Sequence, residues 1–197
     1  MVEKIYLIRH GHINTGGEKR YLGVTDIPLD DLGIEQAKSL KSYFHPIPID
    51  AVFTSPLQRC LKTSAILCDG KNLVSEVVEN FSEINMGDWE NRSIATIKSL
   101  YPEAYEQRGK DLEHFTPPHG ESFKMLSQRV IKAFNAIVLK YSGTIVIVAH
   151  AGVNRMLLTQ LLGKSINDMF SIEQPYACVG ELIFEPTKEQ WHYQRVF

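Results

Sequence analysis

The chain has 197 residues, of which 44% are hydrophobic and 22% are charged, as expected for a single soluble domain with one well-filled core. Its 21 lysines and arginines stand against 23 aspartates and glutamates, so the net charge is −2, and the charges are spread along the sequence. This balance argues against a general nucleic-acid-binding protein and against a protein that binds acidic membrane surfaces. The net charge does not exclude a local pocket that binds a small anion, because such a pocket needs only a few cations.

Strands and helices are predicted to alternate through the first half of the chain. Apolar runs predict three buried strands, over residues 5–8, 51–53 and 73–78. A polar, glycine-containing surface loop is expected from 11 to 28. Asp30 is a favourable N-cap for a helix that ends before Pro46, and Pro56 suits the first turn of a second helix that runs to about residue 67.

The second half continues this alternation after an irregular segment. Residues 81–120 contain several glycines and prolines, and we expect them to form an insertion with one or two short helices that covers a site. The later elements are predicted as a helix over 121–141, an almost wholly apolar central strand over 144–149, a buried helix over 153–162, and a terminal hairpin over 180–184 and 190–196.

This order of elements predicts an α/β fold for residues 1–197, a three-layer α/β/α sandwich with a mostly parallel central sheet. Ligands of such sheets bind beyond the carboxyl ends of the strands. Arg9 and His10 end the first strand, and His150 ends the central strand. Arg59 lies about one helical turn beyond the second strand. We therefore expect these four side chains to meet at one edge of the sheet.

Two histidines and two arginines at one sheet edge favour a phosphate site. Burying so much potential positive charge is costly unless an anion is present, and arginine forks match phosphate oxygens. Neutral imidazole can accept a phosphoryl group, and a carboxylic acid can protonate the leaving group. Glu83, just after the third strand, is the candidate acid; the alternative is a solvated loop carboxylate.

The order of motifs resembles the histidine phosphatase superfamily, which has the phosphoglycerate mutase-like fold. The matching segments are Arg9-His10-Gly11, residues 21–29, residues 54–59, residues 83–90, and residues 120–123 together with 148–153. The three-residue signature is a weak signal by itself, but five motifs in the same order over nearly the whole chain are a strong one.

The resemblance implies a role for each matching position. His10 would be the nucleophile that becomes phosphohistidine, and Glu83 would be the general acid and then the base that activates water. Arg9, Arg59 and His150 would bind the phosphoryl group. The resemblance implies no metal and no other cofactor, and the partner would be a small phosphorylated metabolite.

Other positions are candidates for substrate contact, and several depart from the family pattern. Tyr21 and Gly23 lie in the second motif, and Tyr21 is as compatible with packing as with phosphate binding. His12 and Ile13 stand where an acidic residue and Thr are usual. Gly16 falls where the family often has Asn, for which Asn14 could substitute. These departures concern the substrate more than the catalytic groups.

Further candidates favour structural interpretations. Glu121 is expected to be an acid at a helix start, Trp89 a packed aromatic, and His119 an exposed loop histidine rather than part of the substrate mouth. A zinc site built on His10, His12 and His150 lacks a convincing further ligand.

A phosphatase is favoured over a phosphoglycerate mutase, because the segment between Glu83 and Gly120 is short and lacks the Glu-Arg-His run of mutases. Within the family the chain looks most like the alpha-ribazole phosphatases of cobalamin assembly, although broad sugar-phosphate phosphatases share many of these features. The alternative from another class is a catalytically dead phosphate-binding module, which would need no acid at Glu83.

The cysteines and the apolar runs bear on localisation. Cys60, Cys68 and Cys178 are an odd number without metal-ligand spacing, so we expect three reduced, packed thiols. No apolar run is long enough for a signal-peptide core or a membrane span, so a cytoplasmic protein is expected. The C-terminal hairpin could present the edge of a homodimer.

Overall fold

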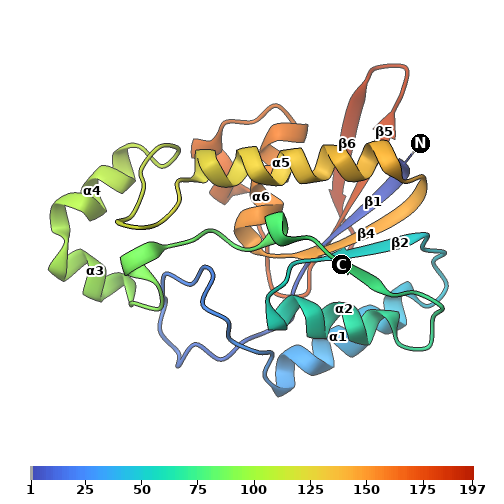
Figure 1. Ribbon diagram of the computed structural model, residues 1–197, viewed down its shortest axis with the longest axis horizontal. Coiled ribbons are helices and arrows are strands. Elements are labelled where there is room, and N and C mark those ends of the chain that lie inside the picture. Colours follow the sequence, from blue (N-terminus) through green and yellow to red (C-terminus); the bar gives the residue numbers. More distant parts are fainter. Residues whose placement is uncertain (1) are drawn as a thin grey trace.

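A computed structural model describes residues 2–197, and its centre is a six-stranded sheet (Figure 1). The strands are β1 (Val2–Arg9), β2 (Ala51–Thr54), β3 (Ser75–Val77), β4 (Gly143–Ala149), β5 (Val179–Glu185) and β6 (Gln190–Arg195). Their order is β3-β2-β4-β1-β5-β6; the first four strands are parallel to one another, and the C-terminal hairpin adds β5 and β6 antiparallel. The expected mostly parallel sheet is confirmed.

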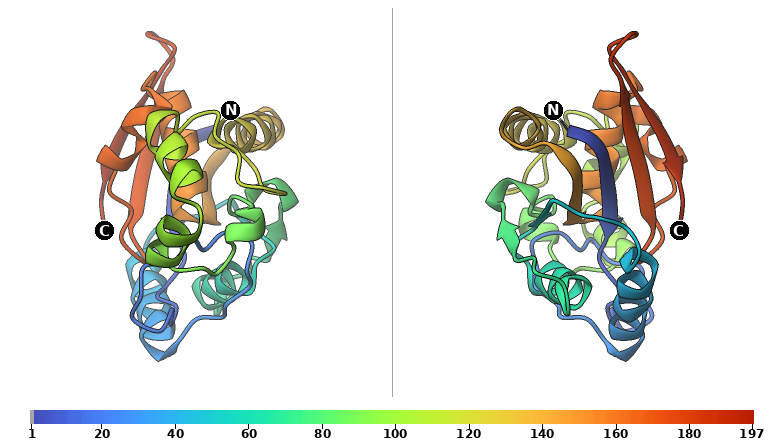
Figure 2. Two further views of the ribbon diagram at one scale, coloured as in Figure 1. Left: turned by 90° about the vertical axis from the view of Figure 1, so that its left-hand side faces the viewer. Right: turned by 90° about the vertical axis from the view of Figure 1, so that its right-hand side faces the viewer.

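Helices cover both faces of the sheet, as the views in Figures 1 and 2 show. One face carries α1 (Asp31–Phe44) and α2 (Gln58–Cys68), and the other carries α5 (Phe123–Lys140) and α6 (Ala151–Leu161). Two further helices, α3 (Ile94–Leu100) and α4 (Pro102–Lys110), lie beyond the end of the sheet. The three-layer α/β/α architecture is therefore confirmed.

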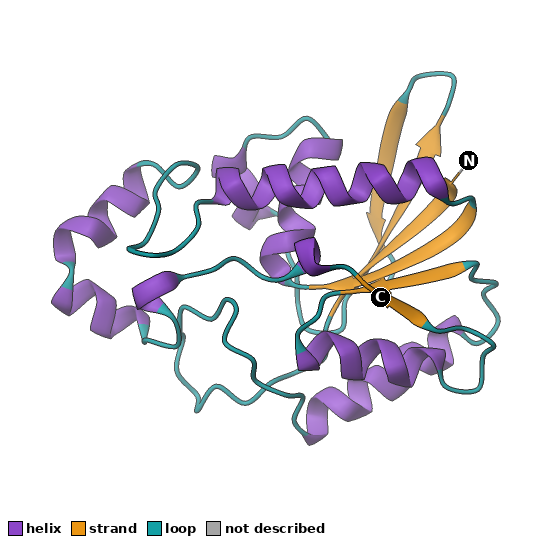
Figure 3. Cartoon of the chain, viewed as in Figure 1, coloured by secondary structure: helices purple, strands orange, loops and turns teal. Residues whose placement is uncertain are grey.

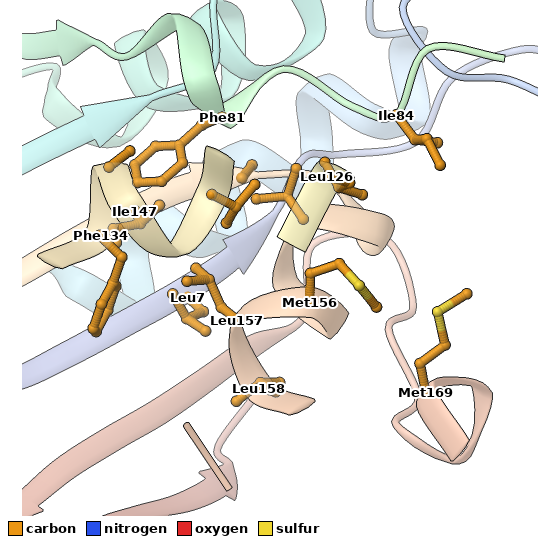
Figure 4. Packing of buried hydrophobic residues seen from close by; sticks show 14 of the residues in the cluster. Leu7, Phe81, Ile84, Leu126, Phe134, Ile147, Met156, Leu157, Leu158 and Met169 are labelled. Carbon is orange, nitrogen blue, oxygen red and sulfur yellow. The ribbon is translucent and has the colours of Figure 1, made fainter. Parts of the chain in front are cut away.

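Alternation along the central strands builds a core on each side. In β1, Ile5 and Leu7 belong to the cluster under α5 and α6, whereas Tyr6 and Ile8 belong to the cluster under α1 and α2. Because both faces are covered, the centre of this strand, residues 5–8, is a continuous apolar run. Figure 4 shows Leu7 and its neighbours packed in the first of these clusters.

The boundaries of three predicted elements were wrong. The first strand begins at Val2 rather than at residue 5. The second helix begins at Gln58 rather than Pro56, because residues 55–57 are still turning away from the strand: the Ser55 hydroxyl accepts from the Leu57 N–H, and Asp26 accepts from the Gln58 N–H. The third strand is shorter than predicted and pairs only over Ser75–Val77.

The segment expected as a surface loop after β1 is a loop, but it is only partly at the surface. Figure 3 shows long loops gathered beyond the carboxyl ends of β1 and β2. Within this segment Ile13 is 2% exposed and Tyr21 is 9% exposed. Asp30 caps α1 as predicted, with its carboxylate accepting from the Gly33 N–H at 2.9 Å. The loop is therefore anchored at both ends and forms part of the interior.

Candidate active site

His10 lies at the carboxyl end of β1 as a buried, neutral imidazole. Its Nδ1 donates to the backbone oxygen of Gly11 at 2.8 Å, because a carbonyl oxygen only accepts. That bond leaves Nε2 as the ring nitrogen with a free lone pair. Burial holds the pKa of His10 well below its usual value, and the charges of Arg59 and Arg9 lower it further. A neutral ring with an available Nε2 is the form that can act as a nucleophile.

Arg59 is almost fully buried in the first turn of α2 and is held by uncharged acceptors. Its two terminal nitrogens donate to the backbone oxygens of Thr25 and Gly23, each at 2.8 Å. Its Nε donates to Nδ1 of His150 at 3.2 Å. Within residues 2–197 it forms no ion pair with a carboxylate. The guanidinium charge is thus positioned by the protein and left uncompensated at the site.

His150 lies at the end of β4, directly behind His10. The two rings are 5.2 Å apart between centroids. Because Nδ1 of His150 accepts from Arg59, Nε2 carries the proton and donates to the Ser55 hydroxyl at 2.7 Å. Burial holds the pKa of His150 well below its usual value, and the neighbouring His10 and Arg59 add to this effect.

Glu83 is placed by two backbone N–H groups from different segments. One carboxylate oxygen accepts from its neighbour Ile84, and the other from Gly152, both at 2.9 Å. Gly152 lies in the first turn of α6, where the helix dipole favours a negative charge. A Cβ atom at Gly152 would lie 2.3 Å from the Glu83 carboxylate, so the absence of a side chain there makes this approach geometrically accessible. A terminal nitrogen of Arg129 also donates a hydrogen bond to the backbone oxygen of Glu83 at 3.0 Å.

Arg9 is held by an aromatic ring that the sequence did not single out. Its guanidinium lies 3.7 Å from the centre of the Tyr176 ring, and one terminal nitrogen donates to the backbone oxygen of Gln174. The same ring packs against His10 and His12, with centroids 5.6 and 4.9 Å away. Burial lowers the pKa of Arg9, and its buried Nε has no hydrogen-bond partner among the described residues.

These groups meet in a cavity of about 630 Å³, a size that suits a small metabolite. Of the residues predicted from sequence, those on its wall are Arg9, His10, Tyr21, Arg59 and Glu83. The rest of the wall is mixed. Its apolar side chains include Ile13, Leu22, Ile84, Met86, Ile94, Phe123, Met169 and Phe170, and its further polar or charged ones include Thr15, Glu18, Lys19, Arg20 and Arg155. The cavity therefore offers both charged groups and apolar surface to a ligand.

Three predicted residues do not line this cavity. His150 is fully buried behind it, and Gly23 acts through its backbone oxygen, which holds Arg59. Asn14 is exposed, and its side chain accepts from the Gly16 N–H at 2.9 Å.

The remaining candidates take structural positions. Glu121 lies just before the helix that Ser122 caps, rather than in its first turn, and forms an ion pair with Arg129 at 2.7 Å. His12 pairs with Asp30 at 2.6 Å. His119 is exposed beside Asp88, and Trp89 is fully buried against Tyr21, as expected.

Sequence reasoning missed Tyr176 and Arg155, both of which line the cavity. Arg155 could have been found, because it stands one helical turn after Ala151 in the helix that follows the His150 motif. Tyr176 follows a proline in an irregular segment and carried no such signal.

Two kinds of feature are absent from residues 2–197: a cluster of metal ligands and a membrane-spanning helix. No group of three His, Cys, Asp or Glu side chains is arranged to hold a metal ion. Over the same residues, the helices are too short or too polar to cross a membrane.

Comparison with known proteins identifies the family. Residues 5–196 match the model of the histidine phosphatase superfamily (branch 1). The adenosylcobalamin/alpha-ribazole phosphatase of Escherichia coli K12 is 29% identical over 89% of this chain and 87% of its own length. Phosphoserine phosphatase 1 of Hydrogenobacter thermophilus is 28% identical over 85% of this chain and 80% of its own length.

Solved structures agree with this result. The crystal structure of a putative alpha-ribazole-5'-P phosphatase from Escherichia coli superposes with a TM-score of 0.91 at 26% identity, over 100% of this chain and 96% of that one. Bacillus stearothermophilus YhfR gives a TM-score of 0.88 at 26% identity, over 98% and 95% of the two chains. The chain belongs to the histidine phosphatase superfamily, and it is a phosphatase.

Proposed function

We propose that the protein is a metal-independent phosphomonoesterase that hydrolyses a small phosphorylated metabolite through a phosphohistidine at His10. The observation that carries this proposal is the neutral His10 ring, whose Nδ1 is committed to Gly11 while the ring lines a cavity shared with Arg9, Arg59 and Glu83. A nucleophile, two fixed cations and a carboxyl group are the parts that phosphoryl transfer through a covalent intermediate requires.

In the first step, Nε2 of His10 attacks phosphorus, and the bond from phosphorus to the ester oxygen breaks. Glu83 in its protonated form gives its proton to the departing alcohol oxygen. Arg9 and Arg59 stabilise the charge on the phosphoryl oxygens, and His150 supports them by fixing the Nε of Arg59.

In the second step, water attacks the phosphorus of phosphohistidine. Glu83, now a carboxylate, accepts a proton from this water, and the electron pair of the breaking P–N bond returns to Nε2. Inorganic phosphate leaves, and the enzyme recovers its starting protonation state. The two backbone donors keep the Glu83 carboxyl group in place through both steps.

A phosphatase fits the cavity better than the alternatives. A phosphate-binding module has no use for a carboxyl group held beside the nucleophile, because a carboxylate there repels phosphate. A mutase would have to retain a bisphosphate and exclude water. Phosphate release in the presence of a chelator separates these functions.

For the substrate, alpha-ribazole 5'-phosphate is the first candidate, because similar proteins carry that activity in their names. The apolar wall near Phe123 and Phe170 would suit its aromatic base. Broad activity on sugar phosphates is the alternative. The test is a panel of alpha-ribazole phosphate, sugar phosphates, phosphoglycerates and phosphopeptides. A strong preference for the first supports cobalamin assembly, whereas similar modest rates indicate a general phosphatase.

We also propose that residues 81–120 cover the site. Ile84, Met86 and Ile94, which lie in this segment, line the cavity and support this assignment.

The cytoplasm is the proposed compartment, in keeping with the buried free thiols of Cys60 and the other two cysteines. Pairing through the β6 edge would make a homodimer, which light scattering coupled to size exclusion would detect.

A further inference from the structure

The cavity carries more positive charge than one phosphate group uses. Its wall contains five cationic side chains and two carboxyl groups, whereas the whole chain has a net charge of −2. The cations are Arg9, Lys19, Arg20, Arg59 and Arg155, and the carboxyl groups are Glu18 and Glu83. With His10 neutral and Glu83 protonated, as the proposed first step requires, the wall has a net charge of +4. A phosphate monoester brings a charge of about −2 at neutral pH, so a surplus of about two positive charges remains.

Arg155 is the cation that accounts best for this surplus. Arg20 is already paired, with Glu18 at 3.2 Å and the Asn91 backbone oxygen at 2.8 Å. Lys19 is exposed, so water screens its charge. Arg155 is half-buried and forms no ion pair within residues 2–197.

The guanidinium of Arg155 is fixed on one side and free on the other. Its Nε donates to the backbone oxygen of Ile172 at 3.0 Å, and its carbon lies 5.4 Å from the centre of the Phe170 ring. Neither terminal nitrogen has a hydrogen-bond partner among the described residues. The side chain is therefore held in position, and its two terminal nitrogens are free to donate hydrogen bonds to a ligand.

The surroundings of Arg155 favour an anion. Burial lowers the pKa of Arg155, and repulsion by Arg9 lowers it further, whereas Glu83 acts in the opposite direction. Arg155 follows Gly152, which positions Glu83, by about one turn of α6. It thus lies on the wall beside the acid that would protonate the leaving group.

We propose that Arg155 binds a carboxylate on the leaving-group side of the substrate, so that the preferred substrates are phosphorylated carboxylic acids. A carboxylate can accept from both terminal nitrogens at once, and its single charge matches that of Arg155. This inference rests on the proposed phosphatase function and separates its candidate substrates. Alpha-ribazole 5'-phosphate has no carboxylate, so it would leave the charge of Arg155 uncompensated.

The test compares two ligands that differ only at this group: 3-phosphoglycerate, and the glycerol phosphate in which CH₂OH replaces its carboxylate. Their dissociation constants are measured by calorimetry with His10→Ala protein, which cannot turn them over by the proposed route. A charge-assisted pair predicts about 10- to 100-fold tighter binding of 3-phosphoglycerate. Adding Arg155→Gln should reduce this preference to about 2-fold or less and leave the affinity for glycerol phosphate within about 3-fold.

Arg155→Lys is the matched variant, because lysine keeps the positive charge but lacks the paired terminal nitrogens of arginine. This variant should retain part of the preference for 3-phosphoglycerate over glycerol phosphate. Equal binding of the two ligands by His10→Ala protein would overturn the proposal. It would also be overturned if Arg155→Gln weakened both ligands alike, since Arg155 would then act on the phosphate. Failure of the wild-type enzyme to release phosphate from any ester would instead refute the phosphatase function, and the binding comparison would still decide the role of Arg155.

Discussion

Glu83 connects local geometry to chemistry at the scale of a single residue, because both of its carboxylate oxygens accept backbone hydrogen bonds. In Glu83→Gln the amide nitrogen cannot accept, so one of the two N–H groups loses its partner, and the side chain can no longer transfer the proton. We expect kcat to fall by about 100- to 10,000-fold, while the lost hydrogen bond lowers the melting temperature by only several degrees and the protein stays folded. Glu113→Gln, at a carboxylate paired with Lys124 outside the cavity, is the control and should keep full activity.

Tyr176 acts on phosphate binding through Arg9, so it is a positioning residue. Tyr176→Leu removes the ring on which the guanidinium lies, and we expect kcat/KM to fall by roughly 3- to 30-fold. Tyr176→Phe keeps the ring and should stay within about 2-fold of the wild type. Steady-state kinetics of both variants decide the point: if Phe and Leu are equally impaired, the ring does not position Arg9.

At the scale of an element, the first turn of α6 has to approach Glu83 closely. Gly152→Ala would place a methyl group 2.3 Å from the Glu83 carboxylate, so the acid must move. We expect a loss of at least about 10-fold in kcat, even though alanine is the better helix former.

The matched control is Gly109→Ala in α4, where the added methyl group would meet no atom within 4 Å. This change should leave activity unchanged and stabilise the protein by about 0.5–1 kcal/mol in chemical denaturation. Full activity in Gly152→Ala would show that the close approach is not needed for catalysis.

The sequence could predict the central elements and the strand-end residues, because both follow from local patterns. Continuous apolar runs mark buried strands, and His10 and Glu83 fall within recognisable motifs. The short third strand and the start of α2 were placed wrongly, since backbone turns and side-chain caps decide such boundaries. Contacts that join distant segments gave no signal: Tyr176 reaches Arg9 across most of the chain.

At the scale of the whole molecule, the two buried histidines couple stability to pH. The pKa values of His10 and His150 lie well below 6.5 in the native state, so below about pH 6.5 the unfolded chain binds protons that the native protein does not. The free energy of unfolding should therefore fall as the pH drops below about 6.5, by up to about 1.4 kcal/mol per pH unit for each histidine.

This slope can be measured by urea denaturation in phosphate-free buffer between about pH 7.5 and 5. His10→Asn should remove one histidine's share of it, whereas His45→Gln, at an exposed position, should leave it unchanged. A flat profile in the wild-type protein would contradict native-state pKa values below the usual range.

The central claim is that the phosphoryl group passes through His10, and the most direct test is to trap that intermediate. A labelled phosphate ester is mixed with the enzyme in chelator, the reaction is stopped in alkaline denaturant, which preserves phosphohistidine, and the peptide that carries the label is identified. We predict one phosphoryl group on His10, with no label and no turnover in His10→Ala. Turnover by His10→Ala, or phosphoryl label on another residue, would contradict the account.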